Sequence, residues 1–381
     1  MPYEQVFKNA KIVLENEVIF GSLQIKDGKI ANIDQGKITT GTDVGGDYLV
    51  PGLIELHTDN IEGHLHPRPK VRWNTLSALH AHDMQICGAG ITTVFDSLRV
   101  GNEELRGVAT SSIAELKDLA DTIAYADKEN LLKAEHFIHL RCEVSLPDTV
   151  DIFDQVADNS QIRLASLMDH APGQRQFATI EAYKIYYQGK YGISDSVFEE
   201  YAARRVKQSA QYSRDNRLTI AQKAKEKNII LASHDDATTD HVSEGLELGV
   251  AVSEFPTTLD AAIHAHKNGL HVLMGAPNIV RGKSHSGNIS ASYLLEHGCL
   301  DILSSDYVPF SLLHSVFAIA GDNDNDLATA MRYVSANPAT AAGLYDRGIL
   351  QQGRRADLLR VRKHQHMPII NGVWREGQRV A

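Results

Sequence analysis

Histidine and carboxylate side chains follow several short apolar segments of this sequence, a pattern suited to binding metal ions. Five segments end in such residues: His57-Thr58-Asp59, Glu143, Asp169-His170, His234-Asp235-Asp236 and Asp306. His57 and Asp59 are two residues apart, so on a strand they point the same way and can hold one ion together. Imidazole and carboxylate ligands suit zinc, manganese, iron or nickel and do not choose among them. One such residue alone is more often structural, but five together predict a metal site, because uncompensated buried polar groups are costly.

Cysteine content and net charge narrow the alternatives. The 381 residues include 18 histidines and three cysteines, so a metal site must be built from imidazole and carboxylate. The cysteines are odd in number and widely spaced, which speaks against a disulfide framework and favours the cytoplasm. A net charge of −10 argues against general binding to nucleic acid or anionic membranes. With no signal-peptide pattern and no apolar run of ~20 residues, we expect neither secretion nor membrane spanning.

The apolar segments alternate with helical patterns through the middle of the chain. Candidate strands cover residues 49–56, 90–95, 137–142, 164–168, 229–233, 251–255, 270–274 and 302–304. Helices are expected over 74–87, 103–128, 197–227 and 259–268. This alternation predicts an α/β fold with a parallel sheet, and about eight strands over ~260 residues suit a (β/α)8 TIM-like barrel better than an open sheet. In a barrel the carboxyl ends of all strands share one face, where active sites are built.

Short strands and turns at the two ends of the chain cannot bury their own faces separately. Asp27-Gly28 near the N-terminus and Asn371-Gly372 near the C-terminus are hairpin signals between apolar runs. We therefore predict one small β-sandwich domain made from residues 1–50 and 345–381. The catalytic barrel, residues 51–344, would be inserted between its two parts.

In these segments the chain resembles the amidohydrolase superfamily, whose members are metal-dependent (β/α)8 barrels with a β-sandwich built from both termini. Residues 51–57 are similar to its first barrel strand and residues 353–358 to its closing segment. The superfamily usually has His-x-His after the first strand, whereas Asp59 holds the second position here, and no counterpart of its carbamylated lysine is found. The resemblance implies one or two divalent ions, with zinc favoured, held by His57, Asp59, Glu143, His170, His234 and Asp306. It also implies that Asp306 accepts the proton of the attacking water.

Longer motifs resemble a narrower family, the diphosphatases of phosphonate catabolism. These motifs are His57-Thr58-Asp59-Asn60, Pro67-Arg68-Pro69 and residues 89–96, 168–177 and 275–288. The resemblance implies hydrolysis of a ribose 1-methylphosphonate 5-triphosphate to the 5-phosphate and pyrophosphate, ahead of carbon–phosphorus lyase. A functional link to the proteins of that pathway and a homo-oligomeric state are left open.

A triphosphate needs cations beyond the metal ions, and basic residues lie near the candidate ligands. We predict that the substrate is bound by Arg68, Arg175, Arg281, Lys283 and His285. The planar guanidinium group suits bidentate contacts to phosphate, and lysine supplies a point charge.

Two alternatives use the same fold. A cyclic-amide hydrolase, deacetylase or deaminase of the superfamily would need fewer cations for its substrate. A non-catalytic scaffold would have lost its metal, which the retained ligand candidates argue against.

Overall fold

The chain folds around two eight-stranded sheets. The computed structural model describes residues 4–105, 108–109, 112–175, 180–192, 194–282 and 288–381. One sheet is parallel and follows chain order: β6 (Leu53–Thr58), β7 (Ile91–Val100), β10 (Glu135–Glu143), β11 (Ile162–Met168), β12 (Ile230–His234), β13 (Val252–Glu254), β14 (His271–Gly275) and β15 (Ile302–Ser304). Each of these strands overlaps one of those predicted from the sequence, so the predicted parallel sheet is confirmed.

The parallel sheet closes on itself between its first and last strands. Thr58, at the end of β6, forms a parallel bridge with Asp306, just beyond β15. The Ser304 hydroxyl donates to the carbonyl of His57 at 2.5 Å and to the carboxylate of Glu55 at 2.7 Å. Glu55 also accepts the backbone N–H of His57 at 2.7 Å. These bonds pin β15 against β6, and the predicted barrel is confirmed.

Helices surround the barrel, and most of them pack apolar residues against it in one large buried cluster. They are α1 (Ile61–Leu65), α2 (Thr75–Gly88), α3 (Ile113–Lys128), α4 (Thr149–Val156), α5 (Ile180–Tyr191), α6 (Asp195–Glu226), α7 (Thr239–Leu248), α8 (Leu259–Lys267), α9 (Ala276–Arg281), α10 (Ala291–Glu296), α11 (Ser311–Ala320), α12 (Asp324–Arg332) and α13 (Ala336–Ala341). The helix predicted over 103–128 was too long. Its first part contains the short antiparallel pair β8 (Glu104–Leu105) and β9 (Val108–Ala109), and α3 begins only after Ser112, whose backbone is extended.

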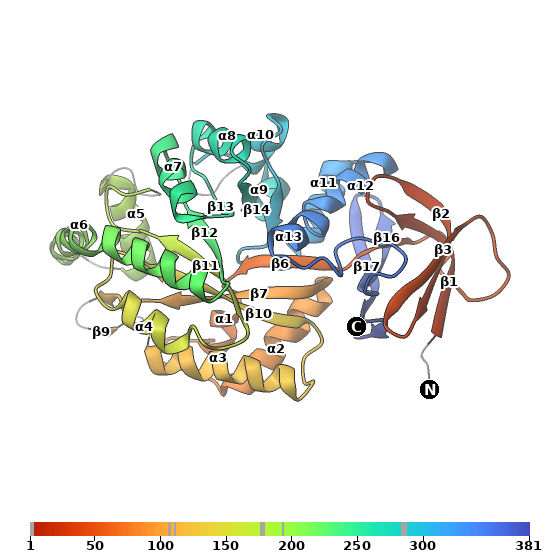
Figure 1. Ribbon diagram of the computed structural model, residues 1–381, viewed down its shortest axis with the longest axis horizontal. Helices are drawn as coiled ribbons and strands as arrows, with labels where there is room; N and C mark the ends of the chain where they lie inside the picture. Colours follow the sequence, from red (N-terminus) through yellow and green to blue (C-terminus); the bar gives the residue numbers. More distant parts are fainter. Residues whose placement is uncertain (1–3, 106–107, 110–111, 176–179, 193, 283–287) are drawn as a thin grey trace.

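Strands from both ends of the chain form the second sheet, which we call the terminal sheet. It lies at one end of the molecule (Figure 1). Its members are β1 (Glu4–Val13), β2 (Val18–Lys26), β3 (Lys29–Gln35), β4 (Thr42–Asp43), β5 (Tyr48–Pro51), β16 (Leu358–His364), β17 (Met367–Arg375) and β18 (Gln378–Arg379). Pairing of β16 with β5 joins the two termini. The second sheet therefore agrees with the small β domain expected from both ends, while the boundaries 1–50 plus 345–381 stay a prediction.

One predicted strand divides between the two sheets. The apolar run 49–56 contains the end of β5 and the start of β6, separated at Gly52. A Cβ at Gly52 would lie 2.3 Å from the Thr92 hydroxyl, so only glycine lets the backbone pass there. This crossing carries the chain directly from the terminal sheet into the barrel.

The two ends of the barrel have different neighbours. The terminal sheet lies at the amino ends of the strands, because β5 runs directly into β6. Helix α6 packs at the carboxyl ends, where Asn216 donates to the carbonyls of Val144 and Leu146 at 2.9 and 2.8 Å. Figure 1 shows α5 and α6 at the side of the molecule opposite the terminal sheet. Below we call the carboxyl ends of the barrel strands the mouth of the barrel.

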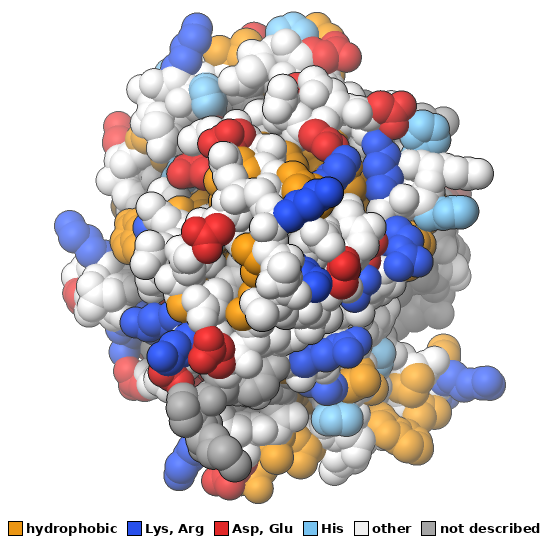
Figure 2. All heavy atoms as spheres, turned by 90° about the vertical axis from the view of Figure 1, so that its right-hand side faces the viewer, with side chains coloured by type: hydrophobic (Ala, Val, Ile, Leu, Met, Phe, Trp, Pro, Cys, Tyr) orange, Lys and Arg blue, Asp and Glu red, His pale blue; other side chains and the backbone are white. Residues whose placement is uncertain are grey.

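Three further features bear on the sequence predictions. Cys87, Cys142 and Cys299 are all buried and free. In the part of the chain that the structure describes, no helix combines the length and apolarity needed to cross a bilayer. Viewed from the terminal sheet, acidic and basic side chains are interspersed over the surface (Figure 2).

Candidate active site

Three of the predicted histidine ligands come together at the mouth of the barrel. His57 ends β6, His234 ends β12, and His170 follows β11. The rings of His57 and His234 are stacked with centroids 5.4 Å apart, and those of His170 and His234 lie edge to face at 5.6 Å. The barrel thus joins residues that are far apart in the sequence, as predicted from their positions after strands.

Two buried carboxylates hold the Nδ1 atoms of these histidines. Glu254 accepts from His57 through Oε1 and from His234 through Oε2, at 3.1 Å in each case. Glu143 Oε2 lies 2.6 Å from His170 Nδ1. Carboxylates in this role fix the tautomer and orientation of metal-binding histidines and leave Nε2 to bind the ion. Burial raises the pKa of both glutamates, but the adjacent histidines outweigh it and hold each pKa well below its usual range.

A buried carboxylate oxygen without a hydrogen-bond donor lies between two of these Nε2 atoms. Asp235 Oδ2 is 3.4 Å from His234 Nε2 and 3.6 Å from His170 Nε2. Within the described chain no group donates a hydrogen bond to it, although buried polar atoms are nearly always paired. Two imidazole nitrogens and a carboxylate oxygen are a typical donor set for zinc or a similar divalent ion. These residues therefore fit a metal ion. We call His57, His170, His234, Asp235 and Glu254 the mouth cluster.

The other predicted metal ligands lie around this cluster. Glu143 contacts His170, as described above, and accepts from Arg205 Nη2 at 3.0 Å. Asp59 is half-buried and accepts from Arg141 Nη1 at 3.2 Å. Whether Asp59 and Glu143 bind an ion stays a prediction.

Asp306 lies where the barrel closes and has a left-handed backbone. Its φ is +56°, and Asp235 has the same value. Non-glycine residues held in this region store strain, which clusters at functional sites. Thr58 Oγ1 donates to the backbone carbonyl of Asp306 at 2.8 Å and anchors it beside His57.

The predicted substrate-binding residues are more scattered. Arg68 and Arg281 are exposed, after α1 and at the end of α9, respectively. Arg175 is buried, and its guanidinium donates to Asp236 and Glu244. Lys283 and His285 lie outside the described residues. The role of all five in binding substrate stays a prediction.

Several residues of the site were not identified as site residues from the sequence. His139 and Arg141 alternate with the predicted ligand Glu143 along β10 and so share the inner face of the barrel with it, a period-two signal within one strand. Glu254 ends β13, which makes it a strand-end carboxylate like the others. Arg205 gave no usable signal, because it comes from the middle of α6 and reaches Glu143 across the fold.

A second group of histidines and carboxylates lies outside the barrel wall, beneath α2. His82 Nε2 and His136 Nδ1 each contact the carboxylate of Asp96 at 2.7 Å. His136 Nε2 contacts Asp83 at 3.2 Å, and Asn60 Nδ2 lies 3.2 Å from His82 Nδ1. Burial acts to lower the pKa of His136, but Asp96 and Asp83 outweigh it and raise that pKa to about 9. We call His82, Asp83, Asp96 and His136 the buried cluster; His136 is an imidazolium between two carboxylates.

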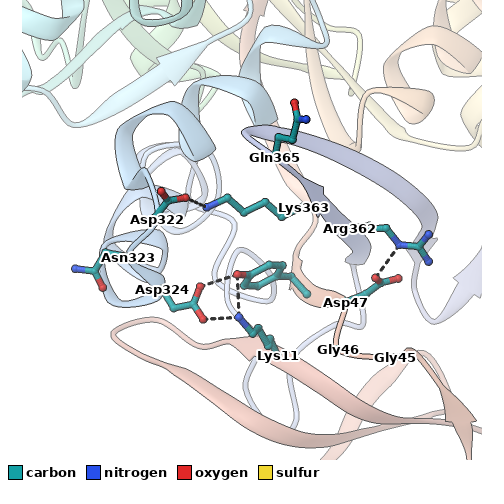
Figure 3. A pocket seen from close by; sticks show the side chains of 11 residues that line it. Lys11, Gly45, Gly46, Asp47, Asp322, Asn323, Asp324, Arg362, Lys363 and Gln365 are labelled. Carbon is teal, nitrogen blue, oxygen red and sulfur yellow. Dashed lines mark hydrogen bonds and ion pairs between the residues drawn. The ribbon is translucent and has the colours of Figure 1, made fainter.

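A cavity of about 700 Å³ lies away from the mouth, between the terminal sheet and α12 (Figure 3). Its charged side chains neutralise one another in pairs. Lys11 pairs with Asp324 and Lys363 with Asp322, both at 2.8 Å. Arg362 pairs with Asp47 at 3.2 Å. This cavity is a polar seam and offers no unpaired charge to a ligand.

Comparison with known proteins agrees with this geometry. The chain is 45% identical over 379 residues to the alpha-D-ribose 1-methylphosphonate 5-triphosphate diphosphatase of Escherichia coli, covering 98% of this chain and 100% of that protein. It matches the structure of N-acetyl-D-glucosamine-6-phosphate deacetylase from Mycobacterium smegmatis over 99% of each chain, with a TM-score of 0.62 and 15% identity. It matches 5-methylcytosine deaminase from Klebsiella pneumoniae over 99% and 98% of the two chains, with a TM-score of 0.67 and 13% identity. No family model matches the chain.

The barrel and the terminal sheet form the fold that the sequence motifs predicted from their resemblance to the amidohydrolase superfamily, and the histidine–carboxylate mouth lies at the strand ends, where a metal site was expected. The two structural matches support this at the level of the fold. The identity across 98% of the chain goes further: the chain belongs to the family of the alpha-D-ribose 1-methylphosphonate 5-triphosphate diphosphatases.

Proposed function

We propose that this chain hydrolyses α-D-ribose 1-methylphosphonate 5-triphosphate to the 5-phosphate and pyrophosphate in phosphonate catabolism. The observation that carries the proposal is 45% identity, over 98% of the chain, to a diphosphatase named for that substrate. The histidine–carboxylate mouth supports it, since phosphoryl transfer depends on charge neutralisation and positioning more than on covalent catalysis. We also propose a cytoplasmic location, which the three buried, free cysteines support.

The mouth residues fit one or two divalent ions, and we propose zinc, with manganese, iron or nickel as alternatives. His57, His170 and His234 would supply imidazole nitrogens. The carboxylates that would complete the site are Asp59, Glu143, Asp235 and Asp306. A bound divalent ion supplies a Lewis acid for a phosphoryl oxygen and lowers the pKa of a coordinated water.

The protein's own groups orient the ligands and move a proton. Glu254 and Glu143 fix the imidazole rings through their Nδ1 atoms. Asp306 would accept a proton from the water whose oxygen attacks the α-phosphorus. The bond between the α-phosphorus and the bridging oxygen then breaks, and that oxygen leaves with pyrophosphate. Asp306 can return its proton to the leaving group, so the catalyst is regenerated.

Phosphorus NMR of the reaction in ¹⁸O-labelled water tests this proposal. We expect pyrophosphate release, with the label on the ribosyl 5-phosphate. Asp306→Asn should abolish turnover, whereas the matched surface variant Asp322→Asn should not. Label in pyrophosphate, or no turnover by the metal-loaded enzyme, would contradict the proposal.

A further inference from the structure

Two arginines lie next to each other on the barrel wall, beside the candidate metal ligands. β7 and β10 pair in parallel, with Arg99 directly opposite Arg141. Residues opposite each other on paired strands point to the same face of the sheet. Arg141 alternates with His139 and Glu143 along β10, and both of these face the candidate site. Both guanidinium groups therefore belong to the inner wall of the mouth.

Arg141 keeps hydrogen-bonding capacity that its contacts do not use. Its Nη1 donates to Asp59 at 3.2 Å, and its side chain is 22% exposed. Its Nε is buried, and none of the described residues accepts a hydrogen bond from it. Arg99 donates to Glu103 at 2.6 Å and is 28% exposed. A ligand entering the mouth can reach both guanidinium groups.

The other two arginines near the mouth are less available. The side chains of Arg175 and Arg205 are 4% and 1% exposed, against 28% and 22% for those of Arg99 and Arg141. The nearby imidazole of His139 is fully buried. Of the described cations at the mouth, Arg99 and Arg141 are thus the ones that combine charge with access.

We infer that Arg141, assisted by Arg99, binds a phosphoryl group of the substrate's polyphosphate chain. The inference rests on the proposed function for the identity of the substrate. The chemistry fits because a guanidinium group offers several donors in a fixed plane, so Arg141 can keep Asp59 through Nη1 and present its remaining donors to phosphoryl oxygens. Because the net charge of the chain is −10, its surface as a whole does not attract an anionic substrate. Cations that bind such a substrate must lie close to its site, as these two guanidinium groups do beside the candidate metal ligands.

Arg141→Gln in the metal-loaded enzyme tests the inference, with Arg141→Lys as a second variant and the exposed Arg332→Gln as the matched control. Binding of inorganic pyrophosphate is measured by calorimetry, and KM and kcat are measured with the ribose triphosphate. We expect Arg141→Gln to weaken pyrophosphate binding about 10- to 100-fold and to raise KM by a similar factor, as for loss of charge-assisted hydrogen bonds. Arg141→Lys should recover part of the binding, and Arg332→Gln should match the wild type. Metal content should stay unchanged in all three.

The outcomes separate this inference from the proposed function. Unchanged pyrophosphate binding in Arg141→Gln, or no pyrophosphate binding by the wild type, would overturn the inference. Loss of metal from Arg141→Gln would also overturn it, because Arg141 would then act only by holding Asp59. If the wild type binds pyrophosphate through Arg141 but does not hydrolyse the ribose triphosphate, the inference stands and the proposed function fails.

Discussion

The mouth cluster and the buried cluster are both built from histidines and carboxylates, but they differ in how many of their polar atoms are hydrogen-bonded. In the buried cluster, both nitrogens of His136 and both oxygens of Asp96 have partners at 2.7–3.2 Å. In the mouth cluster, Asp235 Oδ2 has no donor in the described chain and faces two histidine Nε2 atoms. Polar atoms that already form hydrogen bonds are not available to bind a metal ion. Unpaired ligand atoms, and not residue composition, therefore distinguish the candidate metal centre from the buried cluster.

The clusters also differ in their surroundings. The mouth cluster lies at the carboxyl ends of the strands, where His170 retains 18% side-chain exposure. All four members of the buried cluster are fully buried, between the barrel wall and helix α2. Of the two clusters, only the mouth cluster is therefore accessible to a substrate. We expect the mouth cluster to act in catalysis and the buried cluster to stabilise the fold.

The largest expected effect follows from removing a mouth histidine. His170→Asn keeps a side-chain amide near Glu143 but removes the imidazole, so kcat should fall on the order of 10³-fold, as for loss of several kcal/mol of transition-state stabilisation. Steady-state kinetics of the metal-loaded protein measure this. The exposed His297→Asn is the control. Near-normal kcat in His170→Asn would remove the mouth cluster from the mechanism.

A variant of the buried cluster should show the opposite pattern. His136→Gln leaves Asp83 and Asp96 without their cation, and breaking a buried ion pair costs about 3–5 kcal/mol of unfolding free energy. Urea denaturation measures this cost, and kcat of the folded fraction should stay within about threefold of the wild type. As a control, His266→Gln removes a partly exposed histidine that pairs with Asp301, and should cost less than about 1 kcal/mol. Equal costs in the two variants would contradict the assignment.

The stability contributed by His136 should depend on pH. Its pKa is about 9 in the folded protein against 6.5 for an ordinary histidine. A group whose pKa is raised on folding stabilises fully below its unfolded pKa, and that contribution is lost as pH rises through the folded pKa. The difference in unfolding free energy between wild type and His136→Gln should be largest near pH 6 and shrink toward pH 9. A difference that grows over this range would show that His136 is not an imidazolium.

The smallest effect is expected at Asn60, at the edge of the buried cluster. Asn60 follows Asp59 in sequence and lies 3.2 Å from His82 of the buried cluster. Asn60→Ala removes this hydrogen bond and should lower the unfolding free energy by about 1 kcal/mol. Chemical denaturation measures the loss, and Gln85→Ala, which removes another contact of Asn60, is the comparison variant. A loss as large as that of His136→Gln would mean that the buried cluster depends on Asn60.

The sequence was sufficient to predict the barrel strands and the histidines that follow them. Each strand is a local apolar run, and His57, His170 and His234 stand directly at the strand ends, so no long-range information was needed. The same rule did not place the break at Gly52, because the apolar run continues through both β5 and β6.

The partners of these histidines required the fold. Glu254 contacts His57 across 197 positions of sequence, and Arg205 contacts Glu143 across 62. The alternation of His139, Arg141 and Glu143 was visible, but its meaning depends on which face of β10 lines the barrel. For the same reason the sequence could not separate the mouth cluster from the buried cluster, since satisfaction of hydrogen bonds is a property of the packed structure.

The most direct test of the account is the metal content per chain of the wild type, His170→Asn and His136→Gln, measured by elemental analysis after reconstitution with zinc. The account predicts one or two ions in the wild type, fewer in His170→Asn, and the wild-type number in His136→Gln. Metal retained in His170→Asn and lost from His136→Gln would contradict it, because the buried cluster would then be the metal centre.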